Sequence, residues 1–161
     1  MLARIASAAV LGIDAYLVDV ETDIAFGLPS FATVGLPHGA VKESRERVNS
    51  AIHNTGYLFP LQRITVNLAP ADIRKEGSAF DLPIALGILA ATGQIDPAGL
   101  RGYLVLGELG LDGGIRPIRG ALSMAVAAEQ AGCAGLVVPA ANVREAAGVK
   151  TRDVRGAATL A

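Results

Sequence analysis

Residues 81–92, DLPIALGILAAT, form the most constraining segment of the chain, because the helix that they predict is apolar on every side. The only charged residue in it is Asp81, which stands at the start, where it is placed to cap the helix, and Pro83 fits the first turn. A helix without a polar face belongs in the interior of a domain. The rest of the chain must therefore supply layers that enclose it.

Alternating apolar and polar residues predict the strands of these layers. Residues 16–24, YLVDVETDI, alternate in this way, and an apolar stretch precedes them across the turn-like residues 12–14. Residues 1–26 therefore predict a β-hairpin. Residues 31–34 and 63–68 predict two further strands, each next to glycine or proline.

Helical spacing appears first in residues 39–54, where Val41, Val48 and Ile52 would share one face of an amphipathic helix. Later segments alternate in type and predict, in order, a strand at 103–106, a hairpin at 109–118, a helix at 120–131, a buried strand at 135–139 and a short helix at 142–147. This order indicates the α/β class, as an α+β two-layer domain spanning residues 1–147. Residues 148–161 have little to anchor them and are expected to be a tail or the start of a linker.

Composition excludes several classes of protein. The 161 residues suit one domain, and the 52% hydrophobic content is enough for a core. A formal net charge of −1 provides no general basic field for nucleic acid. Cys133 is the only cysteine, so we expect no disulfide and a cytoplasmic location. The apolar run near the start is too short for a membrane span, and His38 and His53 are too few to hold a metal.

The polar loop before residue 81 carries the best candidate for chemistry. Ser78 follows a glycine near a helix amino terminus, where backbone N–H groups could stabilise an oxyanion. A nucleophilic serine needs a base, and Lys75, Asp72 and Asp81 are the local candidates. A solvated polar loop would have the same composition, and this is the more economical interpretation. The chain contains no GK[ST] motif and therefore no Walker A loop.

Three long phrases carry a family resemblance: VKESRERV, ITVNLAPAD and KEGSAFDLPIA, in residues 41–48, 64–72 and 75–85. In this order they resemble the opening domain of the YifB/ComM family of magnesium-chelatase-like AAA+ ATPases. The resemblance extends over residues 3–146 and departs at His38 and Gly39, where an acidic residue and alanine would be expected. It implies a fold like ribosomal protein S5 domain 2 and like the proteolytic domain of Lon.

The resemblance to Lon also permits a test of catalytic competence. Lon has a K-D-G-P-S-A-G signature with the nucleophilic serine in fifth place, and a P-I-G-G-L-K segment that ends in the base. Residues 75–79, KEGSA, place Ala79 at the nucleophile position, and residues 117–122, PIRGAL, place Leu122 at the base position. The resemblance therefore implies a degenerate dyad without peptidase activity.

The family resemblance implies a non-catalytic domain that assists assembly, or DNA or substrate handling, by a hexameric branch-migration motor in natural transformation. ATP and Mg²⁺ are expected only in an AAA+ domain outside this fragment, and no cofactor within it. Expected partners are that domain, neighbouring subunits and, weakly, DNA, with no membrane. Residual hydrolysis by Ser78 and a pure protein-interaction role are the alternatives. Contacts to DNA or a partner would come from basic residues, which could equally form a solvated face: Lys42, Arg45, Arg47, Arg63, Arg74 and Lys75.

Overall fold

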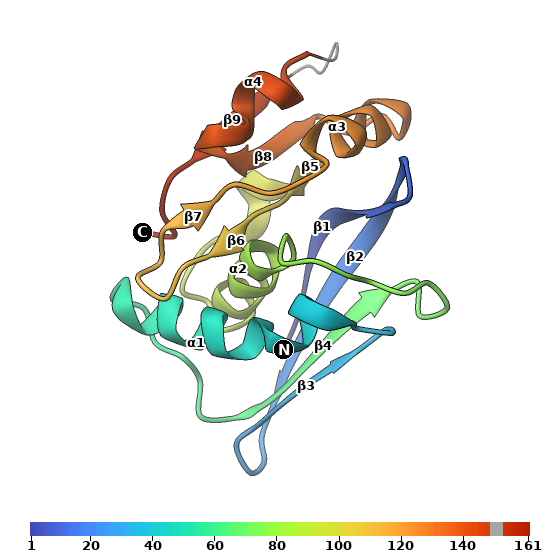
Figure 1. Ribbon diagram of the computed structural model, residues 1–161. Coiled ribbons are helices and arrows are strands. Elements are labelled where there is room, and N and C mark those ends of the chain that lie inside the picture. Colours follow the sequence, from blue (N-terminus) through green and yellow to red (C-terminus); the bar gives the residue numbers. More distant parts are fainter. Residues whose placement is uncertain (149–152) are drawn as a thin grey trace.

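A four-stranded sheet forms one side of the molecule in the computed structural model, which describes residues 1–148 and 153–161 (Figure 1). Its strands stand in the order β1-β2-β4-β3. The pairs β1–β2 and β2–β4 are antiparallel, whereas β3 runs parallel to β4. The bounds are β1 Leu2–Leu11, β2 Asp14–Ala25, β3 Ser30–Val34 and β4 Arg63–Ala69. The predicted hairpin and both predicted strands are confirmed.

The alternation in the strands separates a buried face from an exposed one. Val18, Val20 and Ile24 of β2 are buried, and their neighbours Asp19 and Asp23 are exposed. The inward residues of β4 are likewise apolar and buried. Because side chains alternate between the two faces of a strand, one face of the sheet meets the core and the other meets water.

Two helices cover the buried face. The 3₁₀ turn η1 (Gly39–Glu43) leads into α1 (Ser44–Asn54), and α2 (Asp81–Ala91) packs between α1 and the strands β1 and β2. Every residue of α2 except Leu86 is buried, so its predicted interior position is confirmed. The predicted cap is wrong: Phe80 is the N-cap residue, and the Asp81 side chain accepts hydrogen bonds from Ser44, Arg47 and Leu109 instead.

The second half of the chain adds a smaller parallel sheet and two helices beside the first layer (Figure 1). The sheet has the order β5-β8-β9, and β6 and β7 form the predicted hairpin. Ser7 of β1 donates to the Val105 carbonyl oxygen at 2.8 Å and joins the two parts. The bounds are η2 Pro97–Leu100, β5 Tyr103–Val105, β6 Glu108–Leu109, β7 Ile115–Arg116, α3 Ala121–Gln130, β8 Gly135–Pro139, η3 Ala140–Asn142, α4 Val143–Ala146 and β9 Val154–Ala157.

The last residues are anchored, contrary to expectation. Strand β9 pairs in parallel with β8, Leu160 is buried in the core, and its backbone N–H donates to the Gly113 carbonyl oxygen at 2.8 Å. The expectation of a poorly anchored tail is therefore wrong for residues 153–161. The sequence did not predict this strand because residues 154–157 contain few apolar side chains. Residues 149–152 of the expected tail lie outside the described residues, and the boundary at residue 147 stays a prediction.

The arrangement of sheets and helices confirms the mixed α/β class. In the described part of the chain, no helix has the length and apolar character needed to cross a membrane.

Candidate functional site

A cavity of about 450 Å³ lies where the loop before α2 meets the segment before α3. Residues 76–79 form one wall and residues 117–119 form the other, with Glu108, Val10 and Met124 completing the lining. The fold thus brings together two segments that are almost 40 positions apart in the sequence. They are the same segments that carry the resemblance to the two Lon signatures.

Backbone hydrogen bonds fix the Ser78–Ala79 wall of the cavity. The Gly107 N–H donates to the Ala79 carbonyl oxygen at 2.9 Å, and the Leu82 N–H donates to the Gly107 carbonyl oxygen at 3.0 Å. The Asp81 N–H donates to the Ser78 carbonyl oxygen at 3.1 Å and begins the helix. Ala79 therefore presents a methyl group at a rigid position in the cavity wall, and it carries no nucleophilic atom.

Leu122 does not share this cavity with Ala79. Its side chain is 45% exposed on α3, and its backbone N–H donates to a Glu145 carboxylate oxygen at 3.2 Å. Arg119, three residues earlier, lines the cavity instead, and Glu108 faces it from β6. The charged groups of the cavity are thus carboxylates and a guanidinium, and Arg119 is too basic to accept a proton from serine.

The three bases considered for Ser78 are engaged or placed elsewhere. The Lys75 side chain is buried and its ammonium group donates to the Pro70 carbonyl oxygen. Burial lowers the pKa of Lys75, but the residue does not line the cavity that holds Ser78. Asp72 and Asp81 are also absent from the cavity lining. Ser78 consequently lies in the cavity without any of the bases that the sequence suggested.

Asp81 instead forms the centre of a buried polar cluster. Arg47 donates two hydrogen bonds to the Asp81 carboxylate, from Nε to Oδ2 at 2.6 Å and from Nη2 to Oδ1 at 3.0 Å. Ser44 donates to Oδ1 at 2.7 Å, and the Leu109 backbone N–H donates to Oδ2 at 3.1 Å. Burial raises the pKa of Asp81, and the hydrogen bonds from Arg47, Ser44 and Leu109 oppose this effect. The cluster ties α1, α2 and β6 together.

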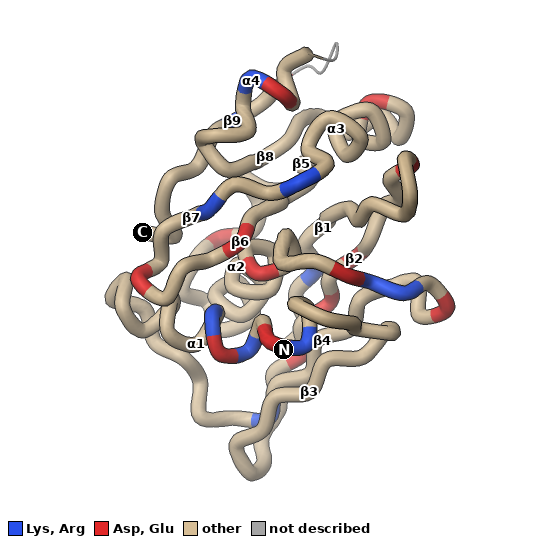
Figure 2. Tube along the Cα trace, in the orientation of Figure 1, with Lys and Arg blue, Asp and Glu red and all other residues tan. Residues whose placement is uncertain are grey.

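The six basic residues proposed as contacts to DNA or a partner differ in how exposed they are and in whether they already have an acidic neighbour. Lys75 is fully buried, and the Arg47 side chain is 18% exposed and bound to Asp81. Arg74 forms an ion pair with Glu76, and Arg45 lies 4.0 Å from Glu46. Lys42 and Arg63 are exposed, on different elements. Figure 2 shows acidic positions next to basic ones along the chain, and four of the six basic side chains are buried or lie beside an acidic residue.

Sequence reasoning missed both Glu108 and the Arg47–Asp81 pair. Glu108 stands in a two-residue strand whose sequence gives no sign of a nearby cavity. Arg47 and Asp81 are 34 positions apart, and each has a local explanation, as a surface residue of an amphipathic helix and as a helix cap. No local pattern could have joined them.

Comparison with known proteins supports one family. The family described as subunit ChlI of Mg-chelatase matches residues 20–142. The competence protein ComM of Haemophilus influenzae is 43% identical over 99% of this chain, which covers 31% of ComM. The YifB proteins of Salmonella typhimurium and Escherichia coli are 46% and 49% identical over 89% and 77% of the chain, covering 28% and 24% of those proteins.

The chain spans about a third of the length of the curated relatives that it matches. The match with the ChlI description covers most of the chain, including both walls of the cavity. The chain therefore belongs to the magnesium-chelatase ChlI-related family, together with YifB and ComM.

Proposed function

We propose that this chain is a non-catalytic accessory domain of a YifB/ComM-type AAA+ ATPase, with a Lon-like fold, and that it serves assembly of the motor. The observation that carries the proposal is the cavity in which Ala79 stands where the resemblance to Lon requires the serine. A rigid wall with a methyl group at that position leaves the scaffold without its nucleophile. ATP and Mg²⁺ would be bound outside this chain, whose sequence contains no GK[ST] motif.

A role in protein contact has more support than a role in DNA contact. Two of the six candidate basic residues, Arg47 and Lys75, are used inside the domain, and Arg74 and Arg45 have acidic neighbours. A phosphate backbone needs several free cations on one surface. We therefore expect the isolated chain to bind branched DNA weakly even at low salt.

Ser78 is expected to remain unlabelled by a serine-reactive fluorophosphonate probe. Neither Lys75, Asp72 nor Asp81 lines its cavity, so none of the three bases suggested by the sequence is in place to activate the hydroxyl group; the carboxylates of the cavity are those of Glu76 and Glu108. The measurement is mass spectrometry of the intact chain after incubation, with a known serine hydrolase as positive control and Ser78→Ala as negative control. Labelling that disappears in Ser78→Ala would support the hydrolase alternative.

Assembly can be tested by exchanging domains with ComM of Haemophilus influenzae. In one variant the third of ComM that matches this chain is deleted, and in the other it is replaced by this chain. We expect the replaced protein to assemble to the same size as intact ComM in light scattering with ATP and Mg²⁺ present, and the deleted protein to form smaller species. Equal assembly of both variants would contradict the proposal. Normal assembly with lost DNA binding in the deleted protein would favour DNA handling.

A further inference from the structure

Strand β3 leaves one side of its backbone unpaired. It stands at the edge of the four-stranded sheet, and no other strand pairs with it in residues 1–148 and 153–161. The Ser30 N–H donates to the Gln62 carbonyl oxygen at 3.3 Å, so Ser30 faces β4. Because this direction alternates along a strand, Ala32 and Val34 also face β4, whereas the N–H and C=O groups of Phe31 and Thr33 point outward.

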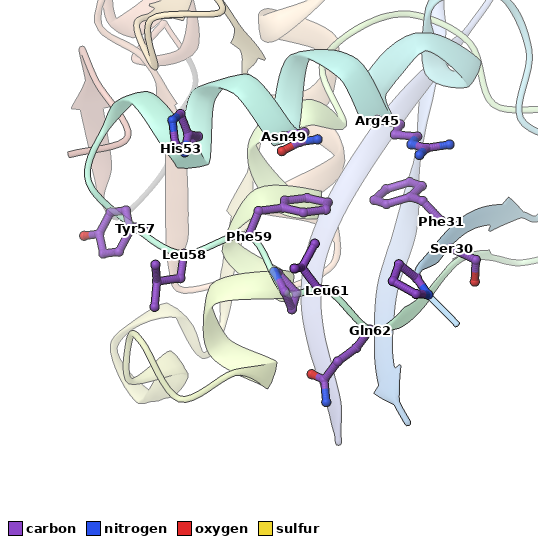
Figure 3. Close-up of a pocket in the computed structure, with 12 residues that line it drawn as sticks. Ser30, Phe31, Arg45, Asn49, His53, Tyr57, Leu58, Phe59, Leu61 and Gln62 are labelled. Atoms are coloured by element: carbon purple, nitrogen blue, oxygen red, sulfur yellow. The ribbon is translucent and has the colours of Figure 1, made fainter. Parts of the chain in front are cut away.

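A groove of about 380 Å³ adjoins this edge, between α1 and the loop of residues 57–62 (Figure 3). The rings of Phe31 and Phe59 stack on its floor, with centroids 6.4 Å apart. Figure 3 shows both rings pointing toward α1, beneath Arg45 and Asn49. The groove thus has an apolar floor and a polar rim at the start of β3, where Pro29, Ser30 and Phe31 line it.

Exposed apolar side chains surround the same place. Phe26 and Leu28, in the loop before β3, are 95% and 89% exposed, and Leu58 and Leu61 are 77% and 82% exposed. The two loops are neighbours because Ser30 and Arg63 are paired in register. Side chains of this size are rarely clustered on a surface that meets only water, and such clusters mark contact sites.

The charges at the groove specify the kind of partner. Arg45 lines it, with the polar side chains of Asn49, His53 and Gln62, and its lining contains no aspartate or glutamate; Glu46, 4.0 Å from Arg45, lies outside the lining. Arg63, at the start of β4, is exposed next to the same loops. A carboxylate close to Arg45 would gain a favourable interaction, whereas a lysine there would be repelled.

We propose that the β3 edge and this groove bind an extended acidic peptide segment, which adds as a strand beside β3 and places an apolar side chain over Phe31 and Phe59. Backbone hydrogen bonds to Phe31 and Thr33 provide general affinity, and the groove selects the side chain, as in other cases of strand addition. Carboxylates of the segment lie next to Arg45. This inference does not depend on the proposed assembly function, since it rests on a different surface from the cavity at Ala79.

Two labelled synthetic peptides test the proposal against the whole chain by fluorescence anisotropy. In one, leucine alternates with glutamate; in the other, leucine alternates with lysine. We expect the glutamate peptide to bind more tightly by about tenfold or more, and more weakly as salt is raised. Arg45→Glu should weaken it by about tenfold, whereas the control Arg144→Glu, exposed on α4 and outside the groove, should leave it within about twofold.

Amide hydrogen exchange distinguishes strand addition from general adhesion. With the glutamate peptide bound, the N–H groups of Phe31 and Thr33 should exchange about tenfold more slowly, and those of Ala32 and Val34 should change little because they already face β4. Thr33→Pro removes an outward N–H without touching the bonds to β4, so it should weaken binding while thermal unfolding shows that the chain still folds.

Several outcomes would overturn the proposal. Equal affinity for the two peptides would show that charge does not select the partner. Unchanged amide exchange at Phe31 and Thr33 would show that the peptide does not add as a strand beside β3. Tighter binding of oligothymidylate to the groove would assign the surface to single-stranded nucleic acid. A dimer in light scattering that is abolished by Thr33→Pro would assign the edge to a second copy of this chain.

Discussion

Asp81→Ala is expected to lower the free energy of unfolding by about 3–5 kcal/mol, because it removes one partner of a buried ion pair. The substitution leaves the Arg47 guanidinium largely buried, and leaves the Ser44 hydroxyl and the Leu109 N–H without their acceptor. A loss of this size is a large part of the total stability of a small domain. Urea denaturation followed by circular dichroism measures it.

The exposed Asp19→Ala on β2 is the matched control and should change stability by no more than about 0.5 kcal/mol. A double-mutant cycle with Arg47→Ala should show a coupling of about 1–3 kcal/mol between the two residues. If Asp81→Ala costs less than about 1 kcal/mol, or if the cycle is additive, the cluster does not hold α1, α2 and β6 together as described.

Gly35→Ala is expected to cost about 3 kcal/mol or more, from two causes that add. Gly35 has a φ of +101°, which strains any residue with a side chain by about 1–3 kcal/mol. A Cβ atom there would also overlap the carbonyl oxygen of Leu68, near the end of β4, so the backbone would have to move. The effect should appear as a lower urea midpoint.

Gly12→Ala separates these two causes. Gly12 has a φ of +67°, but a Cβ atom there would meet no atom within 4 Å. Its cost should therefore be that of backbone strain alone, about 1–2 kcal/mol. Equal losses for the two variants would show that the close approach of Gly35 to Leu68 contributes nothing to the folded state.

Much of the fold could be predicted because its signals are local. The alternation of apolar and polar residues in 16–24 and 63–68 predicts strands with one buried face. The apolar residues 81–92 predict a helix that is buried on all sides. Strand β9 was missed for the opposite reason. Its sequence, VRGA, has little hydrophobic character, and it becomes a strand because β8 offers it a partner.

The candidate site also has one part that the sequence predicted and one part that it did not. The two segments that line the cavity could be named from their resemblance to the Lon signatures, and the structure brings both to one place. The predicted base position does not lie in the cavity: Leu122 is on the surface of α3, and Arg119, Glu108 and Glu76 are the charged residues of the cavity lining. The direction of a side chain at a helix start depends on how that helix packs, which a sequence motif does not state.

The sequence by itself determined the mixed α/β class, the interior position of residues 81–91 and the absence of a serine at position 79, because each follows from residue type and spacing. The tertiary structure alone decided that Asp81 binds Arg47 instead of capping its helix, that Lys75 is buried, and that β3 is an open edge beside a basic aromatic groove. These features join residues that are distant in the chain. Their energies depend on burial and on the distance between charged groups, and both quantities exist only once the chain has folded.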